Sequence, residues 1–236
     1  MLRGIERLAN DMKARIVGQE LVANNLANAT TAGFKAQRAF RTLLNQSVKG
    51  SAKQTLRLYT SFEQGPIERT DRPLDLAING EGFFVIDTPF GERYTRCGAF
   101  TLSSSGLLTT MSGEPVLGSG GPIPIDGQEI TIGRDGTVYV DGDEVGTLRI
   151  VRFDDPQRLV REGNRFAAGG EVALPVNPDE TEIIQGALER SNVNPIDEMV
   201  EMINLHRNFE TAQRSIRLQD ESARQLIERA GTSGRR

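Results

Sequence analysis

Apolar side chains recur at helical spacing at both ends of this chain. In the closing segment, residues 195–230, they alternate three- and four-residue steps, as in a coiled-coil seam, with Gln219 in the one polar position. The members of this seam are Met202, Leu205, Phe209, Ala212, Ile216, Ala223 and Leu226. Asn194 suits an N-cap, Pro195 suits the first helical position, and Gly231 suits the position after the helix. The pattern predicts one long C-terminal helix.

The opening segment, residues 2–29, carries a weaker stripe. Ile5, Leu8, Met12, Val22 and Leu26 keep heptad spacing, but Arg15 and Gln19 fall on the same line. Gly33 offers a left-handed C-cap. A long helix with an uncovered apolar stripe is marginally stable in water. We therefore expect the two helices to pair as a coiled coil and to pack against neighbouring subunits.

The predicted subunit interface combines both stripes with two residues of the polar run that follows the first helix, where side-chain amides can bond across a tight contact. Its residues are Ile5, Leu8, Met12, Val22, Leu26, Asn28, Phe34, Met202, Leu205, Phe209, Ile216 and Leu226.

The middle of the chain shows strands and turns. Turn dipeptides such as Asp135-Gly136 and Asp141-Gly142 separate short β-branched runs, for example Ile130 to Ile132 and Thr137 to Val140. No helical segments intervene, so parallel βαβ units are not expected. The fold class predicted is mixed α and β, with terminal helices paired as a coiled coil and a central antiparallel, Gly-rich β domain.

The domain bounds follow from these patterns. Residues 1–35 form the N-terminal helix of the coiled-coil domain, 36–64 a connecting segment and 65–189 the central β domain. Residues 190–231 form the C-terminal helix, and residues 232–236 form a short tail.

Composition narrows the function classes. The chain has 236 residues, a net charge of −4 and 37% hydrophobic residues. A mildly acidic chain gives no reason to expect nucleic-acid binding. No apolar run approaches the ~20 residues that a membrane helix needs, and the first residues lack the apolar core of a signal peptide. Cys97 is the sole cysteine, and we expect it to be a small apolar filler on a strand.

Candidate chemistry is sparse, and we predict no catalytic, cofactor-binding or metal-binding residue and no cofactor. His206, the sole histidine, lies in the closing helix without a nucleophile motif and is expected to be packed or interfacial. Residues 118–121 (GSGG) lack the rest of a phosphate loop. Asp141, Asp143 and Glu144 lack EF-hand spacing. A further charged set is expected to form surface or intersubunit salt bridges: Asp71, Arg72, Asp75, Arg93 and Arg96.

Four motifs carry a resemblance to a known family. Residues 24–35 (NNLANATTAGFK) resemble the N-terminal signature of bacterial flagellar rod and hook proteins, and residues 73–85 (PLDLAINGEGFFV) resemble their central motif. Residues 94–100 (YTRCGAF) are similar to a strand motif of the family, with Cys97 where a polar residue is usual. Residues 191–200 (SNVNPIDEMV) are similar to the start of its C-terminal helix. The motifs span almost the whole chain in the family's order.

The resemblance implies a structural subunit of the basal-body rod, without enzymatic activity. Such proteins are exported by the flagellar type III apparatus without a cleaved signal and assemble in the periplasm. There they form a hollow helical shaft with copies of themselves and neighbouring rod proteins. The short chain, without a longer insertion after the first helix, favours a rod member other than the distal rod protein; a distal rod or hook-family subunit is the alternative.

Two other classes stay open from the residues alone. A secreted β-domain module that binds carbohydrate would explain the Gly-rich strands but leave the helical ends without a role. A hydrolase would need a pair of acids in a cleft, which is a spatial arrangement.

Overall fold

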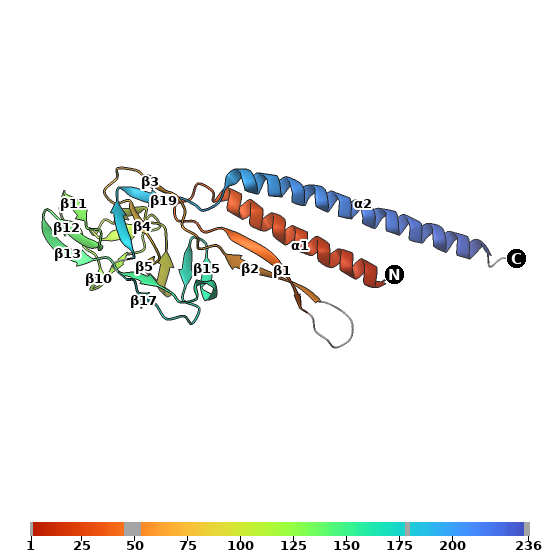
Figure 1. Cartoon of the computed structure of the whole chain (residues 1–236), viewed down its shortest axis with the longest axis horizontal. Helices are drawn as coiled ribbons and strands as arrows, with labels where there is room; N and C mark the ends of the chain where they lie inside the picture. Colours follow the sequence, from red (N-terminus) through yellow and green to blue (C-terminus); the bar gives the residue numbers. More distant parts are fainter. Residues whose placement is uncertain (1, 45–52, 178–179, 234–236) are drawn as a thin grey trace. The chain divides into compact units, whose positions relative to one another are not determined.

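The computed structural model describes residues 2–44, 53–177 and 180–233, with side chains for 12–39, 57–177, 180–218 and 221. Its contacts separate two units (Figure 1). We call residues 1–27, 38–58 and 194–236 the helical unit, and residues 28–37 and 59–193 the β unit.

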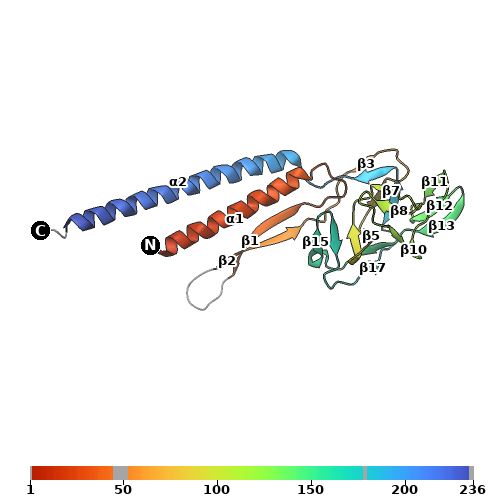
Figure 2. The same cartoon turned by 180° about the vertical axis from the view of Figure 1, so that it is seen from behind.

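The helical unit contains two long helices and most of one hairpin. Helix α1 (Leu2–Ala27) and helix α2 (Pro195–Ser233) lie side by side in opposite directions, as Figures 1 and 2 both show. Strands β1 (Gln37–Leu44) and β2 (Lys53–Thr60) form the hairpin. The predicted N-cap of α2 is present, because the backbone N–H of Ile196 donates to Asn194 Oδ1 at 3.1 Å.

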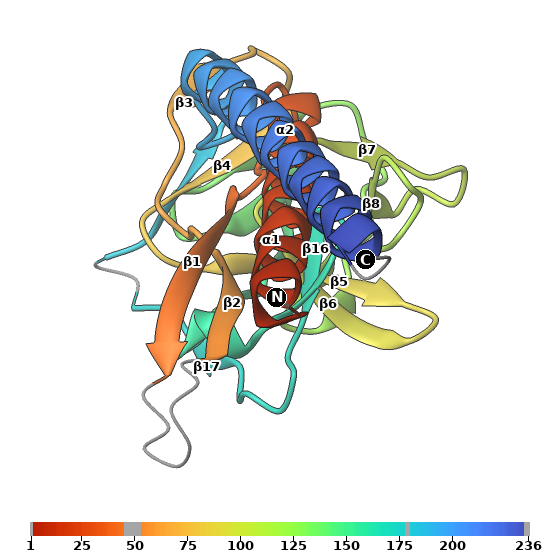
Figure 3. The same cartoon turned by 90° about the vertical axis from the view of Figure 1, so that its right-hand side faces the viewer.

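The prediction of a coiled coil is wrong. The described chain has one long helix at each end and otherwise mainly antiparallel sheets, and no coiled coil is shown. Figure 3 looks along the two helices. The sequence of α1 supplies the physical reason. Arg15 and Gln19 interrupt its apolar line, and Gly18, which has no side chain to act as a knob, faces Leu205. A knobs-into-holes seam needs apolar side chains from both helices.

The β unit is built from short strands that pair antiparallel throughout its described part. One short 3₁₀ helix, η1 (Pro156–Arg158), lies between β14 and β15. The strands are β3 (Ile67–Arg69), β4 (Leu76–Asn79), β5 (Phe83–Thr88), β6 (Gly91–Thr95), β7 (Phe100–Leu102), β8 (Leu108–Thr110), β9 (Leu117–Gly118), β10 (Gly121–Pro122), β11 (Ile130–Ile132), β12 (Thr137–Val140), β13 (Asp143–Thr147), β14 (Ile150–Arg152), β15 (Val160–Glu162), β16 (Arg165–Ala167), β17 (Leu174–Pro175), β18 (Glu182–Gln185) and β19 (Ala187–Glu189).

A six-stranded sheet and a three-stranded meander organise the β unit. The larger sheet has the strand order β15-β16-β6-β5-β14-β17, and the meander is β11-β12-β13. The meander confirms two predicted turns: Gly136 and Gly142 both have positive φ, and Asp141 joins Gly142 in the left-handed region at φ 52°. The Asp141 carboxylate holds this turn by accepting from the backbone N–H groups of Gln128 and Glu129.

Two apolar cores lie on opposite faces of strand β5, whose side chains alternate. Phe84 and Ile86 point to one core with Phe100 and Ile183, whereas Phe83 and Val85 belong to the other. Phe84 and Phe100 meet edge to face, with ring centroids 5.1 Å apart. The alternation explains why β5 is buried on both sides.

Cys97 was expected on a strand, and that expectation is wrong. It lies in the segment between β6 and β7, where its backbone N–H donates to Thr95 Oγ1 at 3.0 Å. Burial raises the pKa of its thiol. The next residue explains the irregular path: Gly98 passes so close to the carbonyl oxygen of Leu76 that no side chain fits.

Candidate functional site

Where their side chains are described, the predicted interface residues on the helices are buried or half-buried, and Leu205 lies against Gly18 of α1. Val22 is buried, and Met12 and Leu26 are half-buried. On α2, the half-buried members are Met202, Leu205, Phe209 and Ile216. The side chains of Ile5, Leu8 and Leu226 lie outside the described set. The structure contains one chain, so the role of these residues between subunits stays a prediction.

Asn28 and Phe34 follow α1 and belong to the β unit. Phe34 is buried in a small cluster with Ala36 and Val193. The Arg161 guanidinium covers its ring at 4.4 Å from the centroid. Asn28 is half-buried and accepts a hydrogen bond from Thr31 Oγ1 at 3.3 Å. Phe34 therefore packs within its own chain.

Helix α2 also presents a second apolar stripe that α1 leaves uncovered. Ile196, Met199, Val200 and Ile203 follow the i, i+3, i+4, i+7 spacing of one helix face. Their exposed fractions are 70%, 51%, 54% and 53%. We call these four residues the exposed stripe. Sequence spacing alone could not separate this stripe from the predicted seam, because it does not tell which face of α2 is covered by α1.

The β unit holds a buried ion cluster that sequence analysis missed. Glu189 on β19 accepts from Lys35 Nζ at 2.7 Å through one oxygen and from Arg96 Nε at 2.8 Å through the other. All three side chains are at most 4% exposed. Such a cluster requires that each charge be paired, because an isolated buried ion is very costly.

Backbone groups complete the pairing of these charges. Arg96 donates to the carbonyl oxygens of Ile78, Gly80 and Gly82, at 2.7 to 3.2 Å. Lys35 Nζ also donates to the carbonyl oxygen of Glu63 at 2.7 Å. Burial lowers the pKa of Lys35, and the neighbouring Glu189 carboxylate opposes that shift. The cluster is therefore a closed network of hydrogen bonds.

This cluster lies where the four sequence motifs meet. Lys35 ends the first motif, Arg96 lies in the third, and the carbonyl groups of residues 78, 80 and 82 belong to the second. The fourth motif joins through Asn192, whose side chain accepts from Ala36 N at 2.7 Å and donates to Ser61 O at 2.9 Å. Gly33, at φ 66°, lets the first motif lie directly against the backbone of Arg96 and Cys97.

Two of the charged residues expected on the surface are buried instead. Arg96 belongs to the buried ion cluster, and Asp75 is 1% exposed. Arg93 follows the prediction better, because it pairs with Glu162 at 2.9 Å at a partly exposed position. Gly33 is left-handed as predicted, but α1 already ends at Ala27, so the glycine serves the motif contact and not a helix cap.

The remaining candidates form no reactive constellation in the described part of the chain. The His206 side chain is exposed on α2, and its Nε2 lies 3.4 Å from Glu210 Oε1. It is therefore not packed within the chain. Across the residues whose positions are described, no group of three potential metal ligands was found. Among the described helices, none is long and apolar enough to cross a membrane.

Comparison with known proteins defines the class. Residues 77–140 match the family model described as the flagellar hook protein FlgE/F/G D1 domain. Residues 184–229 match that described as the flagellar basal body rod FlgEFG protein C-terminal region. The first match runs from β4 to β12, and the second covers β19 and most of α2. Together with the relatives below, these matches show that the chain belongs to the family of flagellar basal-body rod proteins.

Within this family, the short chain favours FlgF over the distal rod protein FlgG, and the comparisons confirm the similarity to FlgF. The flagellar basal-body rod proteins FlgF of Caulobacter vibrioides and Rhizobium meliloti are each 36% identical over 223 residues, covering 90% of this chain and 91% of the relative. FlgG of Buchnera aphidicola is 32% identical over 246 residues, covering 91% and 95%. The alignment with FlgG is longer than the 236 residues of this chain, so it must contain gaps in this chain. These gaps agree with the prediction that the short chain is a rod member other than the distal rod protein.

Proposed function

We propose that this protein is a structural subunit of the flagellar basal-body rod. Copies of it and neighbouring rod proteins assemble into a hollow helical shaft that transmits torque from motor to hook. Membership of the rod family supports this function. The exposed stripe on α2 is the observation that carries it, because a row of apolar side chains on a paired helix marks a contact with another protein.

In this proposal the helical unit forms the inner layer of the shaft and the β unit faces outward. Interfaces of one kind that do not close on themselves produce a helical polymer. The stiffness of such a shaft comes from interlocked helices, which suits a role that needs no catalysis. We further propose that the chain reaches the periplasm through the flagellar type III apparatus without a cleaved signal.

Substitution within the exposed stripe tests the function. Met199→Ser and Ile203→Ser together remove apolar contacts from an already exposed face, so the free subunit should unfold at the same urea concentration as the wild type. Incorporation into purified basal bodies and swimming should both be lost.

Val160→Ser is the matched control, because Val160 is 53% exposed but lies on β15. It should leave incorporation intact. Normal basal bodies containing the doubly substituted chain would contradict the proposed role of the stripe.

A further inference from the structure

The β unit displays one aromatic side chain on a fixed turn. Phe90 is 81% exposed between β5 and β6. The turn that carries it is held by three hydrogen bonds. Thr88 Oγ1 donates to Gly91 O at 2.6 Å, Phe90 N donates to Thr88 Oγ1 at 3.3 Å, and Arg93 Nη1 donates to Phe90 O at 3.0 Å. A side chain on a preordered turn loses little conformational entropy when it binds.

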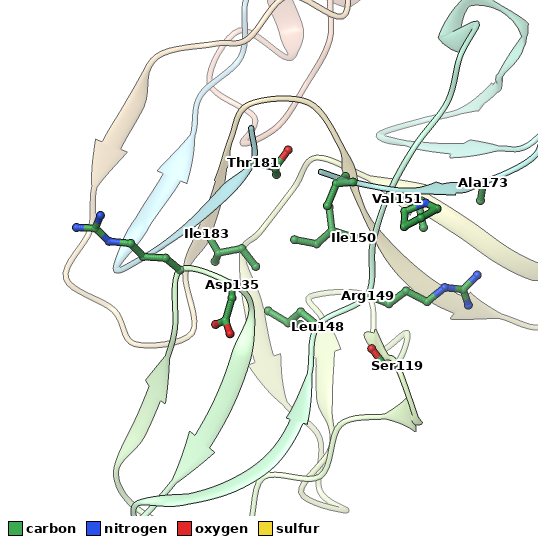
Figure 4. Close-up of a pocket in the computed structure, with 12 residues that line it drawn as sticks. Ser119, Asp135, Leu148, Arg149, Ile150, Val151, Ala173, Thr181 and Ile183 are labelled. Carbon is green, nitrogen blue, oxygen red and sulfur yellow. The ribbon is translucent and has the colours of Figure 1, made fainter. Parts of the chain in front are cut away.

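The same unit has a cavity that could receive such a side chain. Its volume is about 350 Å³. Leu148 and Ile150 line it at the start of β14, and Ile183 lines it from β18 (Figure 4). A cavity of about 150 Å³ with an apolar lining can hold a benzene molecule. The cavity in the β unit is therefore large enough for a phenyl ring and part of the turn that carries it.

Charges of opposite sign accompany the ring and the cavity. Asp87 is exposed on β5, three residues before Phe90. Arg134 lines the cavity with its side chain 85% exposed, and its guanidinium forms a long ion pair with the Glu182 carboxylate at 3.8 Å. Glu92, the strand partner of Asp87, already pairs with Arg149 at 2.6 Å. Asp87 thus supplies an acidic group, and Arg134 a basic one, for a contact between two copies.

We propose that Phe90 of one copy inserts into the cavity of an adjacent copy, with Asp87 beside Arg134. The inference rests on the proposed function, which brings copies together in the rod. Ring and cavity are different surfaces of one chain, so the contact is head to tail and can repeat along a helix. A buried aromatic anchor in a preformed pocket is the usual centre of a protein interface.

Site-directed cross-linking tests the contact in assembled rods. Two tagged forms of the full chain, both carrying Cys97→Ala, are expressed together in a flagellated strain that lacks its own copy. One form carries Phe90→Cys and the other carries Ser119→Cys at the cavity. After mild oxidation of purified basal bodies, we expect a disulfide-linked dimer that contains both tags.

Met111→Cys replaces Phe90→Cys in the control, because Met111 is also an exposed apolar residue on a turn, at 70%. It should give no linked dimer with Ser119→Cys. Absence of the Phe90–Ser119 dimer from basal bodies that contain both forms would overturn the inference and leave the proposed function standing. Absence of the wild-type chain from basal bodies would overturn the proposed function instead.

Exchanging the charges of Asp87 and Arg134 tests the contact independently, in case cysteine at position 90 prevents assembly. Asp87→Arg and Arg134→Asp should each lower incorporation about tenfold, equivalent to about 1.4 kcal/mol. Their combination should restore most of it. If the combination incorporates no better than the single substitutions, Asp87 and Arg134 do not meet and the inference fails.

Discussion

The β unit and the helical unit treat their apolar side chains in opposite ways. In the β unit, residues such as Phe84, Phe100 and Leu108 have no exposed surface, and charged Glu189 is buried with both of its partners. On the described part of α2, Ala212 is the buried apolar residue, whereas Ile196 is 70% exposed. The β unit therefore completes its own core, while the helical unit leaves apolar surface for other subunits to cover.

Disruption of the ion cluster should give the largest loss of stability of the β unit. Glu189→Gln leaves Lys35 and Arg96 buried without a counter-charge, which costs about 3–5 kcal/mol. Urea unfolding followed by circular dichroism should show this loss. The control is Glu68→Gln, which breaks the exposed pair with Arg190 and should cost about 1 kcal/mol or less. Equal losses for both variants would show that burial of the cluster does not matter.

Truncation of a helix contact should separate assembly from folding. The side chain of Leu205 on α2 packs against Gly18 of α1. Leu205→Ala should remove about 2–5 kcal/mol of packing in the assembled rod, and with it incorporation and motility. The urea midpoint of the β unit should not change.

Phe84→Ala is the counterpart within the β unit and should lower that midpoint strongly. A large shift of the midpoint by Leu205→Ala would mean that the two units unfold as one, and the contrast between them would be lost.

Cys97 should report the state of the β unit through its pKa. Burial raises the pKa of this thiol, so the folded protein holds its proton more tightly than the unfolded chain does. Stability should then fall as pH rises through the range between the ordinary thiol pKa, about 8.5, and the raised value. Alkylation of Cys97 at pH 8 should be slow in the native protein and fast in concentrated urea. Cys97→Ala should lack this fall in stability. Equal alkylation rates in both states would contradict the raised pKa.

His206 should give the smallest effect. Its side chain is 65% exposed, and its pair with Glu210 is a surface contact. His206→Gln should leave subunit stability, rod assembly and swimming nearly unchanged. His206→Asp should reduce basal-body counts if this face of α2 becomes buried between subunits, because an unpaired buried charge is costly. Loss of swimming by His206→Gln in rods that assemble normally would indicate a chemical role for this residue.

The sequence by itself determined the elements whose signals are local. The spacing of apolar residues and the cap at Asn194 located α2, and the dipeptides Asp135-Gly136 and Asp141-Gly142 located the meander turns. Backbone geometry at these places depends on neighbours within a few residues. The family motifs could also be read directly from their order along the chain.

Only the tertiary structure decided what covers each side chain. Glu189 and Lys35 are 154 residues apart, so no local pattern marks them as partners. Arg96 shows the same limit: its local sequence predicts a surface charge, and only the complete fold buries it. The coiled-coil prediction failed because an apolar repeat on α2 does not fix the geometry of its contact with α1, where Gly18 replaces a knob. Burial depends on the whole path of the chain, and that path is set by many contacts acting together.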